Sequence, residues 1–316
     1  MKKLVQILCA VVFFSSTVHA GMPAIKIVGS STVYPFTTVV AERFGRGSKF
    51  PTPIVESTGT GGGMKLFCAG YGPQDPSITN ASRAIKPKEE ELCGKNGVSW
   101  IEIAVGNDGI ALANSRQGPD MDVTKEQLWQ AMAALGPKPV KWSDIDPSLP
   151  DMKIHVMVPP PTSGTRDAWN SLVMEKGCPA EIKAKDKKSC HLLREDGAMI
   201  EAGENDTLLV QKLKHDPMYF AIFGFSYLDS NRDSIKSAEI NGKAISLDAI
   251  QDYSYPVARP LYIYIKKQHL GLIPGLREFM GLYVSKKMMG NRGQLIELGL
   301  VPLDADTYKE MVKRTK

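Results

Sequence analysis

The chain has 316 residues, of which 43% are hydrophobic and 23% are charged, with 39 basic side chains against 34 acidic ones. The basic surplus is small and dispersed, and no Lys/Arg-rich block with interleaved aromatic residues occurs, so we expect no nucleic-acid partner. A weak positive charge is compatible with drawing a small anion into a cleft. At this length one core usually gives way to two lobes of about 100–200 residues each.

The first element in chain order is a secretory signal over residues 1–20. Lys2 and Lys3 precede an apolar run over Leu4–Phe14, and Val18 and Ala20 supply the small residues that a signal peptidase needs. We therefore expect export to the periplasm, with cleavage near Ala20/Gly21. An uncleaved N-terminal anchor is the alternative, although the apolar run is short for a membrane-spanning helix.

After this segment, short apolar runs alternate with longer amphipathic segments, which is typical of α/β architecture. We expect strands over residues 24–28, 53–56, 77–80, 101–105, 110–113, 153–158, 220–227 and 260–265. We expect helices over residues 37–44, 164–175, 206–214 and 275–287, and a further helix that begins at residue 63. Asn205 or Asp206 would cap the helix over 206–214.

Four small polar clusters each follow an expected strand. They are Gly29–Thr32 (GSST), Ser57–Gly63 (STGTGGG), Asn80–Arg83 (NASR) and Thr162–Arg166 (TSGTR). A helix N-terminus has free N–H groups and partial positive charge, so it can hold an anion through backbone donors. Singly, each cluster could be an ordinary helix cap or turn. Four together at the carboxyl ends of strands predict one shared anion site.

Two arginines stand directly after hydroxyl residues of these clusters: Arg83 follows Ser82, and Arg166 follows Thr165. The guanidinium group offers a planar fork of donors that suits an oxyanion. The alternative for either arginine is a surface or hinge salt bridge.

Signatures of nucleotide binding and of catalysis are lacking. The glycine-rich cluster has no Walker A Gly-Lys-Ser/Thr sequence and no G-x-G-x-x-G register. No G-x-S-x-G or H-E-x-x-H motif occurs, and no histidine has a recognisable triad context. We therefore expect no enzyme activity, no cofactor and no metal. An exported phosphate-ester hydrolase with Ser31 or Ser163 as nucleophile is the alternative, and an adhesion or scaffold protein is a weaker one.

Removal of residues 1–20 would leave four cysteines, Cys68, Cys93, Cys178 and Cys190. An even count in an exported chain favours disulfides, and the spacing suggests the local pairs Cys68–Cys93 and Cys178–Cys190. A zinc site is the competing interpretation, but the sequence has no C-x-x-C and no histidine pair at ligand spacing.

The clusters resemble the periplasmic phosphate-binding proteins of the ABC phosphate uptake system. The matching segments are 29–35 (GSSTVYP), 57–63, 81–83 (ASR) and 163–167 (SGTRD), and segments 203–206 and 220–227 resemble that family's second lobe. The resemblance implies a type II periplasmic binding fold: two α/β lobes with mixed sheets, helices on both faces and two hinge strands. With crossings near 105–108 and 258–260, lobe 1 would comprise residues 21–107 and 259–316, and lobe 2 residues 108–258.

The resemblance also implies inorganic phosphate as the ligand and the membrane permease of an ABC importer as the partner, and we expect a monomer. It assigns the ligand roles to the first, second and fourth clusters, to which the residue pattern adds Ser82 and the two arginines. The expected ligand set is Ser31, Thr32, Thr60, Gly61, Ser82, Arg83, Ser163, Gly164, Thr165 and Arg166.

Two departures from the family pattern bear on specificity. Many members have an aspartate where this chain has Arg83, and an arginine where it has Pro159. That aspartate accepts a proton from hydrogen phosphate, whereas a buried carboxylate repels sulfate, which has no proton to donate. Asp108 and Asp167 are the candidates for a replacement acceptor. Another tetrahedral oxyanion, such as sulfate or molybdate, stays an alternative ligand.

Overall fold

The computed structural model describes residues 22–161, 163–203 and 206–315. The expected signal peptide, Thr162 of the fourth cluster and residues 204–205 lie outside the described residues. No helix in the described ranges is both long enough and apolar enough to cross a membrane.

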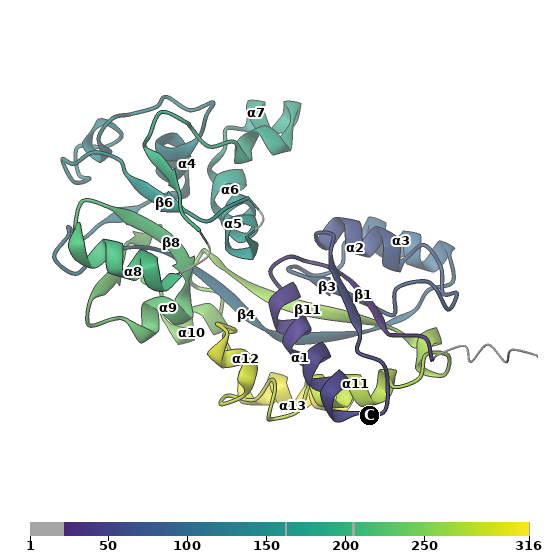
Figure 1. The fold of residues 1–316 in the computed structure, drawn as a ribbon. Coiled ribbons are helices and arrows are strands. Elements are labelled where there is room, and N and C mark those ends of the chain that lie inside the picture. Colours follow the sequence, from purple (N-terminus) through teal and green to yellow (C-terminus); the bar gives the residue numbers. More distant parts are fainter. Residues whose placement is uncertain (1–21, 162, 204–205, 316) are drawn as a thin grey trace, which may run out of the picture.

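Two sheets form the two lobes and share one long strand (Figure 1). The first sheet has the order β2 (Ile54–Ser57), β1 (Lys26–Gly29), β3 (Ile78–Ala81), β11 (Ala258–Lys266) and β4 (Trp100–Ser115). The second continues from β4 to β8 (Phe220–Gly224), β6 (Val156–Val158) and β7 (Met199–Glu201), with β9 (Ile235–Ser237) also paired to β4. A small separate sheet pairs β5 (Asp122–Val123) with β10 (Glu239–Ile240). Both large sheets are mixed, because β11 runs antiparallel to β3 and β8 runs antiparallel to β4.

The expected break between the strands 101–105 and 110–113 is wrong. Both belong to the single strand β4, whose 16 residues are continuous. The intervening residues 106–109 stay extended because they pair with residues 258–261 of β11, with a register shift between Leu261 and Tyr262. Beyond this point β4 pairs with β8, so β4 and β11 are the strands that pass between the lobes (Figure 1).

Helices cover both faces of each sheet (Figure 1). Around the first sheet lie α1 (Tyr34–Gly47), α2 (Thr60–Phe67), α3 (Pro87–Lys95), the short η4 (Lys267–Leu270), α11 (Leu276–Tyr283), α12 (Gln294–Glu297) and α13 (Ala305–Arg314). Around the second lie α4 (Lys125–Met132), η1 (Trp142–Asp144), α5 (Gly164–Trp169), η2 (Asn170–Met174), α6 (Glu175–Gly177), α7 (Ala180–Lys185), η3 (Lys187–His191), α8 (Asp206–His215), α9 (Phe225–Ser230) and α10 (Leu247–Gln251).

The expected elements match the observed ones in most cases, with shifted ends. The expected strand 220–227 is wrong at its end, because helix α9 begins at Phe225. This helix buries Phe225 and Leu228, which are three residues apart on one helical face. The expected strand 153–158 is reduced to Val156–Val158. Helices α3, α4 and α13 were not predicted; α3 and α13 are rich in charged residues and show few apolar positions, while α4 is only eight residues long.

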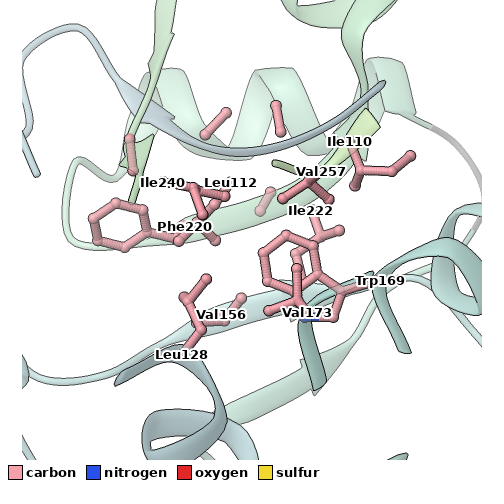
Figure 2. Packing of buried hydrophobic residues seen from close by; sticks show 14 of the residues in the cluster. Ile110, Leu112, Leu128, Val156, Trp169, Val173, Phe220, Ile222, Ile240 and Val257 are labelled. Carbon is pink, nitrogen blue, oxygen red and sulfur yellow. The ribbon is translucent and has the colours of Figure 1, made fainter. Parts of the chain in front are cut away.

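Each lobe has its own hydrophobic core. Buried residues from Ile110 to Val257, joined by Val301, form the core of lobe 2, in which Trp169 and Val173 pack beside Ile222 (Figure 2). A second cluster runs from Ile25 to Val105 and from Leu261 to Met311, and a smaller third cluster surrounds Phe67. Separate cores are what two lobes joined by only two strands require.

Both expected disulfides are confirmed. Cys68 is bonded to Cys93, which ties the end of α2 to α3, and Cys178 is bonded to Cys190, which ties α6 to η3. In the described ranges, no three histidine, cysteine or acidic side chains are grouped so as to hold a metal ion.

Candidate anion-binding site

Three of the four polar clusters join a strand to a helix, as expected. β1 ends at Gly29 and α1 begins at Tyr34; β2 ends at Ser57 and α2 begins at Thr60; β6 ends at Val158 and α5 begins at Gly164. The cluster Asn80–Arg83 follows β3, but the next helix begins only at Pro87. Gly29 is required at its position, because its φ is +126° and a Cβ there would lie 2.2 Å from the carbonyl oxygen of Asn80.

A cavity of about 780 Å³ lies between the lobes and takes residues from both. Five of the ten expected ligand residues line it: Ser31, Thr32, Ser163, Gly164 and Thr165. Its other lining residues are Tyr34, Pro35, Phe36, Ser57, Asp108, Pro159, Pro161, Asp167, Gly224, Ser226, Tyr227, Leu298 and Gly299. The first and fourth clusters, which are 132 residues apart in sequence, therefore face the same space.

These two clusters also touch each other directly. The Thr32 hydroxyl donates a hydrogen bond of 3.1 Å to the carbonyl oxygen of Gly164, the first residue of α5. Gly164 has no room for a side chain, because a Cβ there would lie 2.5 Å from the Cα of Thr32. The Thr32 amide donates to the Ser30 hydroxyl, which fixes the loop locally. The close approach of the two backbones thus depends on a glycine at the start of α5.

The second and third clusters contact each other outside the lining of the cavity. The hydroxyl oxygens of Thr60 and Ser82 lie 3.0 Å apart, and the Ser82 amide donates to the Thr60 hydroxyl oxygen. Gly61 is exposed, and a Cβ there would meet no atom within 4 Å. From these two clusters, Ser57 alone lines the cavity.

Neither expected arginine lines the cavity. The two terminal nitrogens of Arg83 donate to the two carboxylate oxygens of Glu89, at 2.8 and 2.7 Å. Partial burial opposes ionisation of Glu89, but Arg83 and the backbone amide of Lys86 outweigh it and hold the pKa of this carboxyl below its ordinary value. Arg166 is buried and donates to the carbonyl oxygen of Pro159 and, at 3.4 Å, to Asn170.

Arg259 of β11 is a residue that the sequence analysis missed. It is 6% exposed, and its guanidinium group donates to the Thr32 hydroxyl oxygen at 2.7 Å and to the Asp108 carboxylate at 3.3 Å. It also reaches Ser171 at 3.3 Å and Asp167 at 3.7 Å, both in lobe 2. The signal in the sequence was the expected crossing 258–260: in the antiparallel pairing of β4 and β11, Arg259 lies opposite Asp108.

Two carboxylates line the cavity beside this arginine. The Asp108 side chain is only 14% exposed, and burial raises its pKa although the Arg259 charge opposes the shift. The Asp167 side chain is 54% exposed. Among the described residues that line the cavity, the acidic side chains are the buried Asp108 and the exposed Asp167, with the buried Arg259 behind them. The other polar groups of the described lining are hydroxyl and backbone groups.

Comparisons with known proteins bear on the family to which the chain belongs. A family model described as a PBP superfamily domain matches residues 15–287. The protein SphX of Synechococcus elongatus is 32% identical over 295 residues, which cover 90% of this chain and 79% of that protein. The phosphate-binding protein PstS of Staphylococcus saprophyticus is 29% identical, over 92% of this chain and 83% of that protein.

Solved structures show the same fold. A possible phosphate-binding protein from Planctomyces limnophilus is similar with a TM-score of 0.78 and 27% identity, over 94% of this chain and 98% of that one. PstS from Borrelia burgdorferi, at 17% identity, has a TM-score of 0.62 over 89% of this chain and 99% of that one, a likeness of fold. The family model, the relatives and the two-lobe fold together show that the chain belongs to the PBP superfamily, as a homologue of the SphX and PstS proteins.

Proposed function

We propose that this chain is an exported solute-binding protein that captures inorganic phosphate between its lobes and delivers it to the permease of an ABC importer. The observation that carries the proposal is the cavity whose polar lining comes from both lobes, with hydroxyl donors at the start of two helices. The printed names of the relatives and neighbours, among them a structure from Clostridium perfringens with bound phosphate, support phosphate as the anion.

The wall that lobe 2 contributes suits an anion for a physical reason. Ser163 is extended and precedes α5, so the amides of the first turn, including those of Gly164 and Thr165, have no acceptor within the helix. The helix continues through η2 and α6 to Gly177, which aligns further peptide dipoles behind this end. An oxyanion placed here is held by N–H and O–H donors without a side-chain charge.

We propose Ser31, Thr32, Ser163, Gly164 and Thr165 as the residues that contact the anion. Thr60 and Gly61 at the start of α2, and Ser82 after β3, form a second group in lobe 1, which we expect to move with the first loop on closure. We assign structural roles to Arg83 and Arg166, because each is already bound to protein groups and neither lines the cavity.

We propose Asp108 as the acceptor for the proton of hydrogen phosphate. It lines the cavity and is largely buried, and burial raises its pKa because the charged carboxylate has lost water. A hydrogen-bond donor on the anion would replace that lost hydration. Sulfate has no proton to donate, so a sulfate oxygen would face the Asp108 carboxylate with no hydrogen bond between them. Asp167, more exposed, would contribute less.

We further propose that the chain acts as a monomer in the periplasm and performs no catalysis. The lobe boundaries 21–107 and 259–316 against 108–258 belong to the same proposal, and the separate cores support them. A hydrolase would use Ser31 or Ser163, yet no histidine of the described residues lines the cavity. A phosphomonoester assay, with and without zinc, is expected to show no turnover.

Calorimetric titration of the mature chain with phosphate, sulfate, arsenate and molybdate tests the proposal. We expect phosphate to bind with micromolar or tighter affinity and sulfate to bind more weakly. If no oxyanion binds, the receptor function fails. If sulfate or molybdate binds tighter than phosphate, the fold is retained but the substrate is different.

A further inference from the structure

Arg259 belongs to the hinge and contacts both lobes. Its strand β11 and the opposite strand β4 are the two that pass between the lobes. Its guanidinium group binds Thr32 in lobe 1, Asp108 in β4, and Ser171 and Asp167 in lobe 2. Three of these partners, Thr32, Asp108 and Asp167, line the cavity, while Arg259 itself lies behind them and is 6% exposed.

The bond between Arg259 and Thr32 fixes the direction in which the Thr32 hydroxyl works. A threonine hydroxyl can donate one hydrogen bond and can accept two, and an arginine can only donate. With Arg259 donating into the Thr32 oxygen at 2.7 Å, the Thr32 hydrogen is left to donate elsewhere. It donates to the carbonyl oxygen of Gly164 across the cleft, at 3.1 Å.

Donation from a charged group also strengthens this second bond. A guanidinium group bound to the hydroxyl oxygen polarises the O–H bond, and bonds in such a chain reinforce one another at low local dielectric. Arg259 and Thr32 are both buried, so water competes little for either bond. Asp108 offsets the arginine charge, which lets the guanidinium group stay buried at the hinge.

We propose that Arg259 is a positioning residue: it holds Thr32 as a hydrogen-bond donor across the cleft and thereby controls how readily the lobes close on the anion. This inference rests on the proposed phosphate-capture function. In the closed protein the Thr32 hydroxyl donates its hydrogen bond either to the carbonyl oxygen of Gly164 or to an anion oxygen at the same place. In both cases Arg259 fixes the hydroxyl as the donor.

A positioning role of Arg259 and a purely structural pairing with Asp108 predict different effects of mutation. If Arg259 only neutralised Asp108, its loss would weaken phosphate binding independently of Thr32. If it acts through Thr32, the losses of phosphate affinity in the two variants overlap. Without Arg259 the Thr32 hydroxyl has no fixed direction of donation, so its removal then weakens binding little further. A double-mutant cycle measures this overlap directly.

The experiment compares the wild type, Thr32→Val, Arg259→Gln and the double variant by calorimetric titration with phosphate, after thermal melting has shown that each is folded. We expect Thr32→Val to weaken binding about 10- to 100-fold in the wild-type background. In the Arg259→Gln background we expect the same change to cost less than about threefold. An equal loss in both backgrounds would overturn the proposal.

Arg259→Lys, alone and combined with Thr32→Val, provides a second cycle in case the Arg259→Gln variant does not fold. Arg259→Lys keeps a positive charge beside Asp108 but lacks the planar fork, so we expect its cycle with Thr32→Val to resemble that of Arg259→Gln. If lysine instead retains the full effect of Thr32→Val, a cationic donor without the planar fork is sufficient and the role assigned to the guanidinium group is wrong. This cycle replaces the first one if Arg259→Gln does not fold.

A closure measurement keeps the two proposals apart. Small-angle scattering without phosphate gives the radius of gyration of the wild type, Thr32→Val, an Arg259 variant that folds, and the matching double variant. We expect both single changes to enlarge the radius and the double variant to enlarge it no further. If the wild type binds no oxyanion but this pattern holds, the phosphate function fails and the role of Arg259 stands. If it binds none and the radius is unchanged, both fail.

Discussion

Arg83 and Glu89 form a bidentate ion pair of 2.7 and 2.8 Å, and this pair lies outside the lining of the interlobe cavity. The sequence places Arg83 in a polar cluster after a strand, where its guanidinium group was expected to meet the anion. In the structure the same group secures the start of α3, since Glu89 also accepts from the backbone amide of Lys86.

Arg83→Ala is therefore expected to leave phosphate affinity within about threefold of the wild type. It is expected to lower the free energy of unfolding by about 1 kcal/mol, because a partly exposed ion pair contributes little. Calorimetric titration and urea unfolding give the two quantities. A loss of affinity of 10-fold or more would return Arg83 to the ligand set.

Thr165→Val is expected to weaken phosphate binding about 10- to 150-fold, the equivalent of about 1.5–3 kcal/mol for a hydrogen bond to a charged group. The residue lines the cavity at the second position of α5, and valine keeps its shape but removes the hydroxyl. Thr315→Val, at the far C-terminal end, is the matched control, because the Thr315 hydroxyl bonds only its own last helical turn, at Val312. Equal affinities of the two variants would remove Thr165 from the site.

Asp108→Asn is expected to narrow the preference for phosphate over sulfate by about 10-fold or more, mainly through stronger sulfate binding. A neutral amide no longer repels the fully ionised sulfate, and its NH₂ group can donate to it. Asp167→Asn should have a smaller effect, since that side chain is 54% exposed against 14% for Asp108. If the larger change appears at Asp167, the acceptor is assigned to the wrong carboxylate.

Lys266 gives a prediction about stability and pH. Its side chain is fully buried over the Phe67 ring, donates to the carbonyl oxygen of Gly70, and burial lowers its pKa to about 8. Below pH 8 both folded and unfolded chains carry this proton. Between about pH 8 and 10.5 the unfolded chain binds it more strongly, so the free energy of unfolding should rise with pH, by at most about 3 kcal/mol.

Urea unfolding between pH 7.5 and 10 measures this rise. Buried tyrosines such as Tyr264, whose pKa values are raised by burial, act in the opposite direction, so the comparison is between the wild type and Lys266→Met. The difference in unfolding free energy between the two should change with pH over this range. Lys65→Met, at an exposed lysine of α2, should leave the pH dependence as it is in the wild type. A Lys266→Met variant with the wild-type slope would contradict the assignment.

The sequence predicted those parts of the fold that depend on local pattern. Apolar runs marked the strands β1 and β6, the small polar clusters marked the loops after them, and the cysteine spacing marked both disulfides. Each of these features depends on residues that are close in sequence; the partners of the two disulfides are 25 and 12 residues apart. The resemblance to a known family supplied the two-lobe arrangement that local pattern alone does not contain.

The missed features depend on pairing between distant segments. Residues 106–109 form no strand pattern of their own, yet they are extended because β11 pairs with them from 150 residues away. For the same reason Arg259 was missed, although the expected crossing 258–260 contained it: its partners Thr32 and Asp108 are 227 and 151 residues distant in sequence. Arg83, in contrast, was assigned from its neighbours in the cluster, while Glu89, six residues on, is its partner.

A crystal structure of the mature chain grown with phosphate tests whether the anion is held between the lobes. We expect phosphate oxygens within hydrogen-bond distance of Ser31 or Thr32 from lobe 1 and of Ser163 or Thr165 from lobe 2, with Asp108 facing the protonated oxygen. Phosphate bound to one lobe alone, or beside Arg83 with the cavity between Thr32 and Thr165 left to solvent, would contradict it.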